Sequence, residues 1–99
     1  MATLERKNDE TWVCLDENLD VSNISEFRTT MKKVVSRKAP YVLDGSAVTR
    51  VHTAALQVLL ALITAIKSKD KSFRWESSSE PLLSAATALG LKKELGIKK

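Results

Sequence analysis

Residues 53–67 contain the most apolar segment of the chain, and this segment limits the folds that the chain can adopt. Its apolar side chains recur at helical spacing and cover more than half of the circumference of a helix, so this helix must be broadly buried. They are Ala55, Leu56, Leu59, Leu60, Leu62, Ile63 and Ile66. We expect Leu60, like Leu56 and Leu59, to lie in the core. The run is shorter than the roughly 20 residues that a membrane helix needs, which indicates a soluble protein.

Shorter segments on both sides of this helix predict strands. Residues 11–15 (TWVCL), 41–44 (YVLD) and 73–77 (FRWES) are rich in β-branched, aromatic and apolar residues, as strands are. The charged segment at the N-terminus adds an edge strand before residue 11, with residues 7–9 as the turn. The strand at residues 73–77 places Phe73 and Trp75 on the same side.

Two further segments predict helices that alternate with these strands. Apolar residues in the range 21–37 recur on one helical stripe, with Ser22 or Ser25 as the N-cap and Pro40 just beyond the end. The last helix has Ser79 or Glu80 as its N-cap and a proline in its first turn, and it ends near a glycine, with one short turn after it.

This alternation predicts an α/β fold and a single domain over residues 1–99. It also implies right-handed βαβ units, so the strands are expected to form a mostly parallel four-stranded sheet with an N-terminal edge hairpin and with helices packed against it.

Composition excludes several classes of protein. The net charge is +4, but the lysines are scattered and several lie at predicted helix ends, so we expect solvated helix ends and no nucleic-acid partner. The N-terminus has no apolar signal segment, and we expect no direct membrane insertion. The single Cys14 offers neither a disulfide nor a zinc site and is expected to be a buried, inert thiol. These features together predict a cytoplasmic protein.

No group of residues in the sequence resembles a catalytic centre. Asp16, Glu17 and Asp20 follow the first predicted core strand, and we interpret them as an exposed acidic loop because no catalytic base is spaced to work with them. His52 and Cys14 are the only residues of their kinds, and the sequence alone does not exclude that they meet in space. We therefore expect a protein that is not an enzyme and that has no catalytic residues, cofactor or metal site.

The position of one loop suggests where a partner binds. In open α/β sheets, ligands and partners meet the loops beyond the carboxyl ends of the strands. Here that edge contains the loop after the predicted strand YVLD and the start of the most apolar helix. The partner-contact residues that we expect are Asp44, Gly45, Ser46, Arg50, His52, Thr53 and Ala54.

Residues 41–62 resemble the STAS family, which includes anti-sigma-factor antagonists and the cytoplasmic tails of sulfate transporters. The family pattern is a hydrophobic strand ending in Asp, a short loop, an acid followed by Ser or Thr, small residues and an apolar helix. Here these parts are YVLD, GSAVTRV, HTAAL and QVLLALITAIK. The segments FRWES and SEPLLSAATALGL are also similar to small STAS proteins, so the resemblance spans nearly the whole chain. It implies a STAS-type fold and a non-enzymatic protein interaction module.

The resemblance implies a role for Thr53. This residue matches the hydroxyl that partner kinases phosphorylate in antagonist members, and it also suits the N-cap of the apolar helix. His52 occupies the position of the family's acid. We expect its imidazole not to make the contacts of a carboxylate, which argues against inherited kinase recognition.

Several functions remain open at this point. The partner is expected to be an anti-sigma kinase, a chemotaxis component, or the other subunits of a phospholipid-transport ABC system. A second class of function is binding of a small ligand, a nucleotide or a lipid, at the edge of the sheet. The sequence alone does not decide the oligomeric state.

Overall fold

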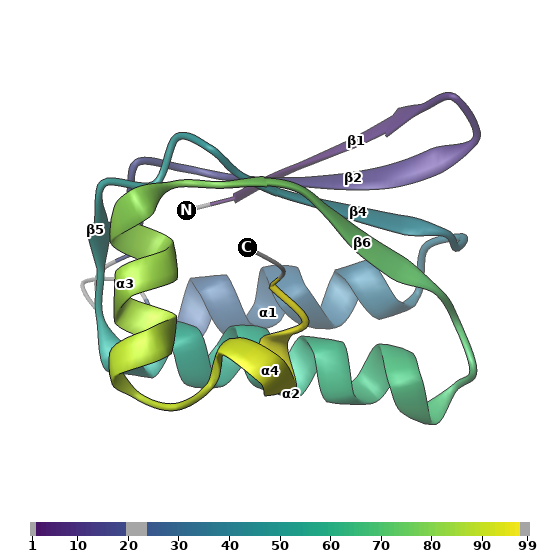
Figure 1. The fold of residues 1–99 in the computed structure, drawn as a ribbon. Coiled ribbons are helices and arrows are strands. Elements are labelled where there is room, and N and C mark those ends of the chain that lie inside the picture. The colour runs from purple at the N-terminus through teal and green to yellow at the C-terminus, as the bar shows by residue number, and fades with distance from the viewer. Residues whose placement is uncertain (1, 20–23, 98–99) are drawn as a thin grey trace.

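Four strands form one mixed sheet, and helices cover only one of its faces (Figure 1). The computed structural model describes residues 2–19 and 24–97. The strand order is β1-β2-β4-β6. β1 (Ala2–Lys7) and β2 (Glu10–Leu15) are antiparallel, whereas β4 (Tyr41–Gly45) and β6 (Phe73–Ser78) continue the sheet in parallel. The predicted α/β fold, with its edge hairpin and otherwise parallel sheet, is confirmed.

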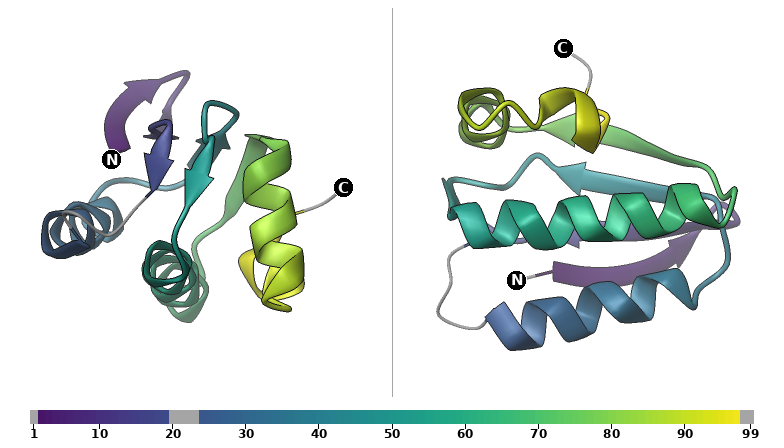
Figure 2. Two further views of the ribbon diagram at one scale, coloured as in Figure 1. Left: turned by 90° about the vertical axis from the view of Figure 1, so that its left-hand side faces the viewer. Right: turned by 90° about the horizontal axis from the view of Figure 1, so that it is seen from below.

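The helices pack beneath the sheet. They are α1 (Ile24–Val35), α2 (Thr53–Ser68), α3 (Glu80–Ala88) and the short α4 (Lys92–Leu95). Figure 2 shows α1 and α2 side by side under the strands, with α3 on the other side of α2. The helices turn apolar stripes toward the sheet, for example Phe27, Met31 and Val34 of α1. The core therefore lies between the sheet and these helices.

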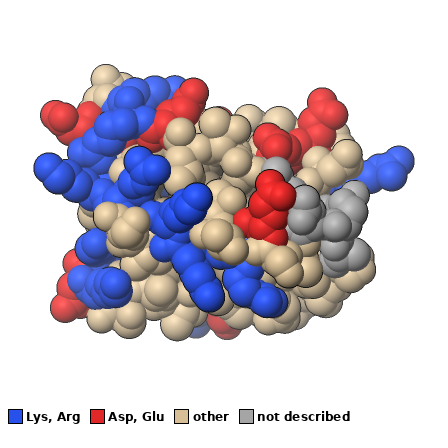
Figure 3. Space-filling view, turned by 180° about the vertical axis from the view of Figure 1, so that it is seen from behind, with Lys and Arg blue, Asp and Glu red and all other residues tan. Residues whose placement is uncertain are grey.

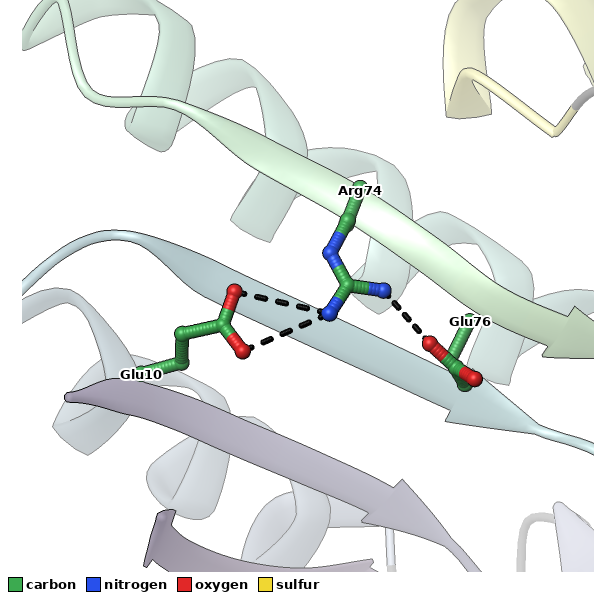
Figure 4. A network of polar contacts seen from close by, with 3 residues as sticks. All are labelled: Glu10, Arg74 and Glu76. Atoms are coloured by element: carbon green, nitrogen blue, oxygen red, sulfur yellow. Dashed lines mark hydrogen bonds and ion pairs between the residues drawn. The ribbon is translucent and has the colours of Figure 1, made fainter. Parts of the chain in front are cut away.

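The two faces of the sheet differ in how their apolar side chains are covered. Val13 and Leu43 face the helices and are fully buried. Trp12 faces the other way, where Lys7 places its Nζ atom 4.0 Å from the centroid of the indole ring. On the same face Arg74 bridges Glu10, across β4, and Glu76 (Figure 4). The charged side chains of Lys7 and Arg74 thus pack over Trp12, which faces away from the helices.

Leu60 corrects one prediction about the core. Leu56 and Leu59 of α2 are buried as expected, but Leu60 is only partly buried and packs at the margin of the core. Successive residues of a helix turn by about 100°, so Leu60 points well away from Leu59 and toward the border of the exposed side. The buried stripe includes Val58 instead, which the sequence did not assign to the core.

The ends of α1 differ from the sequence-based expectation. It begins at Ile24 and ends at Val35, before the predicted end at residue 37. Ser25 lies inside the helix and is not its N-cap, and Ser22 lies outside the described residues.

The C-terminal part of the chain follows the prediction closely. Ser79 is the N-cap of α3, because its Oγ atom accepts a hydrogen bond from the amide of Leu82 at 3.2 Å. Gly90 follows the helix with a positive φ of 70°. The Nε1 atom of Trp75 donates to the carbonyl oxygen of Leu95 at 2.9 Å, which joins β6 to α4. Leu95 and Ile97 are themselves part of the core.

Candidate functional site

The loop after β4 is held in a defined shape by its own polar groups. A carboxylate oxygen of Asp44 accepts a hydrogen bond from the amide of Ser46 at 3.0 Å. The carbonyl oxygen of Gly45 accepts from the amides of Val48 at 3.3 Å and Ser79 at 3.1 Å. Val48 is buried, so its side chain anchors the loop to the core. The loop therefore presents a fixed surface.

A second loop braces this one. The carbonyl oxygen of Glu17 accepts hydrogen bonds from the amides of Thr49 at 2.8 Å and Arg50 at 3.0 Å. The short strands β3 (Asn18–Leu19) and β5 (Arg50–Val51), which the sequence did not predict, pair in parallel. The loops that follow β2 and β4 thus form one unit at the carboxyl ends of these two strands, where open α/β sheets bind ligands and partners.

His52 is the N-cap of α2, a role that the sequence assigned to Thr53. Its backbone is extended, with φ −100° and ψ 147°, and its Nδ1 atom accepts a hydrogen bond from the amide of Ala54 at 3.2 Å. Thr53 is the first residue of the helix and is not the cap. Nδ1 is as many bonds from Cα as the carboxylate oxygen of aspartate, so a neutral imidazole reaches the same amide. The expectation that His52 makes none of the carboxylate's contacts was wrong.

This contact predicts how the helix start responds to substitution. We expect His52→Ala to lower the free energy of unfolding by about 0.5–2 kcal/mol, the usual cost of losing an N-cap, and to fall at the lower end because His52 is exposed. His52→Asp should retain the stability, since a carboxylate caps well and favours the positive end of the helix dipole. Urea denaturation followed by circular dichroism measures both variants. Equal midpoints for His52→Ala and the unchanged protein would show that the imidazole does not stabilise the helix.

The predicted contact residues lie together but differ in exposure. Ser46, Arg50, His52 and Thr53 are exposed, and they lie on the loop and on the first residue of α2. Asp44 and Ala54 are half-buried. Gly45 is buried against Leu82 and Trp75, so it shapes the loop and adds little surface. The exposed members form the candidate contact surface.

The other groups considered for chemistry lie elsewhere. Asp16 and Glu17 are exposed, as predicted, and Asp20 lies outside the described residues. Cys14 is half-buried on the helix-free face of the sheet, where its Sγ atom lies 3.7 Å from a carboxylate oxygen of Glu5. Partial burial, assisted by that carboxylate, raises the pKa of the thiol and makes it less reactive. Residues 2–19 and 24–97 contain no group of His, Cys, Asp and Glu that could hold a metal ion.

Comparison with protein families identifies the fold family of the chain. A family model described as "Mlab, STAS domain" matches residues 2–97. The chain belongs to the STAS family. STAS domains generally mediate protein–protein interactions, which agrees with the general type of module that the sequence predicted. No curated protein matches the chain. Among the described residues of this STAS protein, no helix is long and apolar enough to cross a membrane.

Sequence reasoning missed part of this STAS site for an identifiable reason. The bracing by Glu17 and Leu19 uses carbonyl oxygens, which every residue has, so no residue type in the sequence signals it. The sequence did contain a signal for the cap at His52. This residue directly precedes a helix, and its Nδ1 acceptor is as many bonds from Cα as the carboxylate oxygen of aspartate.

Proposed function

We propose that this STAS protein is a cytoplasmic, non-enzymatic docking module in a bacterial signalling or chemotaxis-associated pathway. Its partner binds over the surface formed by Ser46, Arg50, His52 and Thr53. The observation that supports this proposal is that exposed polar side chains stand on a loop held by hydrogen bonds from two neighbouring segments. A preformed surface of this kind binds a partner without paying much ordering entropy. His52 uses Nδ1 for the cap, which supports a binding role over an acid–base role.

We further propose that Thr53 is the phosphoacceptor that regulates docking. Its side chain is exposed in the first turn of α2, where the positive end of the helix dipole favours an anion. A phosphate would add about −1.5 to −2 charges at pH 7. A partner that binds this surface must remove water from it, and removing water from a phosphate is costly. Phosphorylation therefore releases the partner.

The experiment measures partner capture by tagged protein in extracts of the cells that encode it. We expect Thr53→Glu to reduce capture on the order of tenfold. A carboxylate at a docking surface must lose water on binding, and it repels any negative charge of the partner. Thr53→Ser should bind like the unchanged protein and should still accept phosphate. Intact-mass measurement of the chain isolated from those cells tests whether the modification occurs.

Thr87→Glu is the matched control, because Thr87 is also exposed and lies in the last turn of α3, on neither the docking loop nor α2. It introduces the same charge and should leave capture unchanged. Equal capture by Thr53→Glu and the unchanged protein would show that Thr53 is not a switch. Equal loss in both variants would show a general charge effect and would contradict docking at this surface.

A second candidate function is a constitutive subunit of a phospholipid-transport ABC system. The description of the matching family model as "Mlab, STAS domain" favours it. A permanent subunit needs no switch, so the partner set would contain transporter subunits, and no phosphate would be found on Thr53. Identification of the captured proteins by mass spectrometry separates the two functions.

A further inference from the structure

A groove runs between α1 and α2 and begins beside the docking surface. Its volume is about 410 Å³, and its floor is formed by Met31, Val58 and Leu62. Each of these three side chains is at most 6% exposed, so the floor is part of the protein core. Ala54 lines one end and directly follows Thr53. The groove is therefore continuous with the surface at which we propose that a partner docks.

The α2 wall of the groove is uncharged and consists mostly of small side chains. Ala54, Ala61 and Ala65 line it together with Gln57, at spacings that place them on one face of the helix. No charged residue occurs between His52 and Lys67, although four positions in that interval are exposed. A helix face that only meets water normally carries charged side chains. Small side chains also allow a second helix to approach closely.

The α1 wall supplies positive charge. Arg28 and Lys32 line the groove and are exposed. They are four residues apart, so two like charges stand side by side on α1, an arrangement that weakens an isolated helix. Within residues 2–19 and 24–97 neither side chain forms an ion pair. Figure 3 shows the molecule from the side on which α1 lies, and Lys and Arg side chains gather there. The groove therefore combines an apolar floor with a cationic rim.

We propose that this groove binds an amphipathic helix of the partner protein, whose apolar stripe is flanked by Glu or Asp. The apolar floor takes the stripe, and the acidic residues pair with Arg28 and Lys32, as in helix-in-groove recognition. A second copy of this chain fits poorly, because its net charge is +4 and its long helix α2 contains no acid. This inference rests on the proposed function and names the chemistry of the partner segment.

The first experiment uses synthetic peptides as probes of the groove. One is an 18-residue helix with Leu at every third or fourth position and Glu on both flanks, and the other has Lys in place of each Glu. Each is titrated into ¹⁵N-labelled full chain and followed by amide chemical shifts. We expect the acidic peptide to bind, with the largest shifts between residues 54 and 65 and in α1. The basic peptide should bind at least tenfold more weakly, because it meets two like charges.

Variants test whether the contact is made in the groove. Arg28→Glu combined with Lys32→Glu should weaken binding of the acidic peptide roughly tenfold, since each exposed pair contributes modestly. Ala61→Glu should abolish binding, because it places a carboxylate where the apolar stripe of the peptide would lie. Lys33→Glu is the control, because Lys33 is exposed on α1 and does not line the groove. All of these positions are exposed, and an unchanged circular dichroism spectrum verifies that each variant folds.

Several results would overturn the proposal. They are equal affinity for the two peptides, no binding of the acidic peptide at millimolar concentration, and shifts confined to other surfaces. If oleate binds the groove in preference to the acidic peptide, the occupant is a lipid and not a partner helix. If the protein self-associates and Ala61→Glu removes that association, the occupant is a second copy of this chain. If Thr53→Glu loses partner capture and the Arg28 and Lys32 double variant keeps it, the partner does not use the groove, and the proposed function stands. If the double variant loses capture and Thr53→Glu keeps it, docking at the Thr53 surface is refuted and binding in the groove stands.

Discussion

Leu59→Ala is expected to lower the free energy of unfolding by about 2–5 kcal/mol, the range for a buried leucine cut back to alanine. Leu59 is 0% exposed and lies in the centre of the buried stripe of α2. Removing its side chain deletes apolar contacts and leaves a cavity between α2 and the sheet. Urea or thermal unfolding of the purified protein measures the loss.

Leu60→Ala is the matched comparison, because it makes the same chemical change one residue later. Leu60 is only partly buried, so its replacement should cost clearly less than that of Leu59. The two variants together test the direction of the α2 face. A larger loss in Leu60→Ala than in Leu59→Ala would mean that α2 is rotated about its axis, with Leu60 and not Leu59 facing the core.

Gly45→Ala is expected to be the second most damaging change, at about 1–3 kcal/mol, because it overfills a packed site. A Cβ atom at Gly45 would lie 2.5 Å from Cδ2 of Leu82 and 3.3 Å from the ring of Trp75. Leu82 is fully buried and has little room to move. The strain would also reach the docking loop, since the carbonyl of Gly45 holds Val48 and Ser79.

The control for Gly45→Ala is Ser46→Ala, one residue farther along the same loop. Ser46 is exposed, and its amide keeps its hydrogen bond to Asp44 when the side chain is shortened. Its unfolding midpoint should match that of the unchanged protein within error. If Gly45→Ala is equally silent, Leu82 repacks without cost and the contact does not constrain the loop.

The elements that the sequence predicted correctly are those with a local physical cause. Asn8 and Asp9 tolerate positive φ, here 54° and 60°, so the hairpin turn was readable from residue type. Ser79 caps α3 as expected, because a serine just before a helix with a proline in its first turn is a local signal. The candidate loop was found from its place after a strand, a rule that depends only on element order.

The errors concern properties that depend on tertiary packing. The sequence marks Leu60 as apolar, but only the contact between α2 and its neighbours decides which apolar positions are buried. The groove likewise needs residues from α1 and α2 together, so neither Arg28 nor Ala61 stood out alone. One signal was nevertheless present, namely the absence of charge along the exposed positions of α2.

The core positions of Leu95 and Ile97 have a consequence for how the protein is made. These side chains follow all the strands and the longer helices in sequence, yet they complete the same core as Val13 of β2. A growing chain on the ribosome lacks them until α4 has been made, and until then Trp75 has no acceptor for its indole N–H at the carbonyl of Leu95. The STAS core therefore closes only after α4 has been synthesised, and a chain that stops before α4 exposes apolar surface to cellular proteases and chaperones.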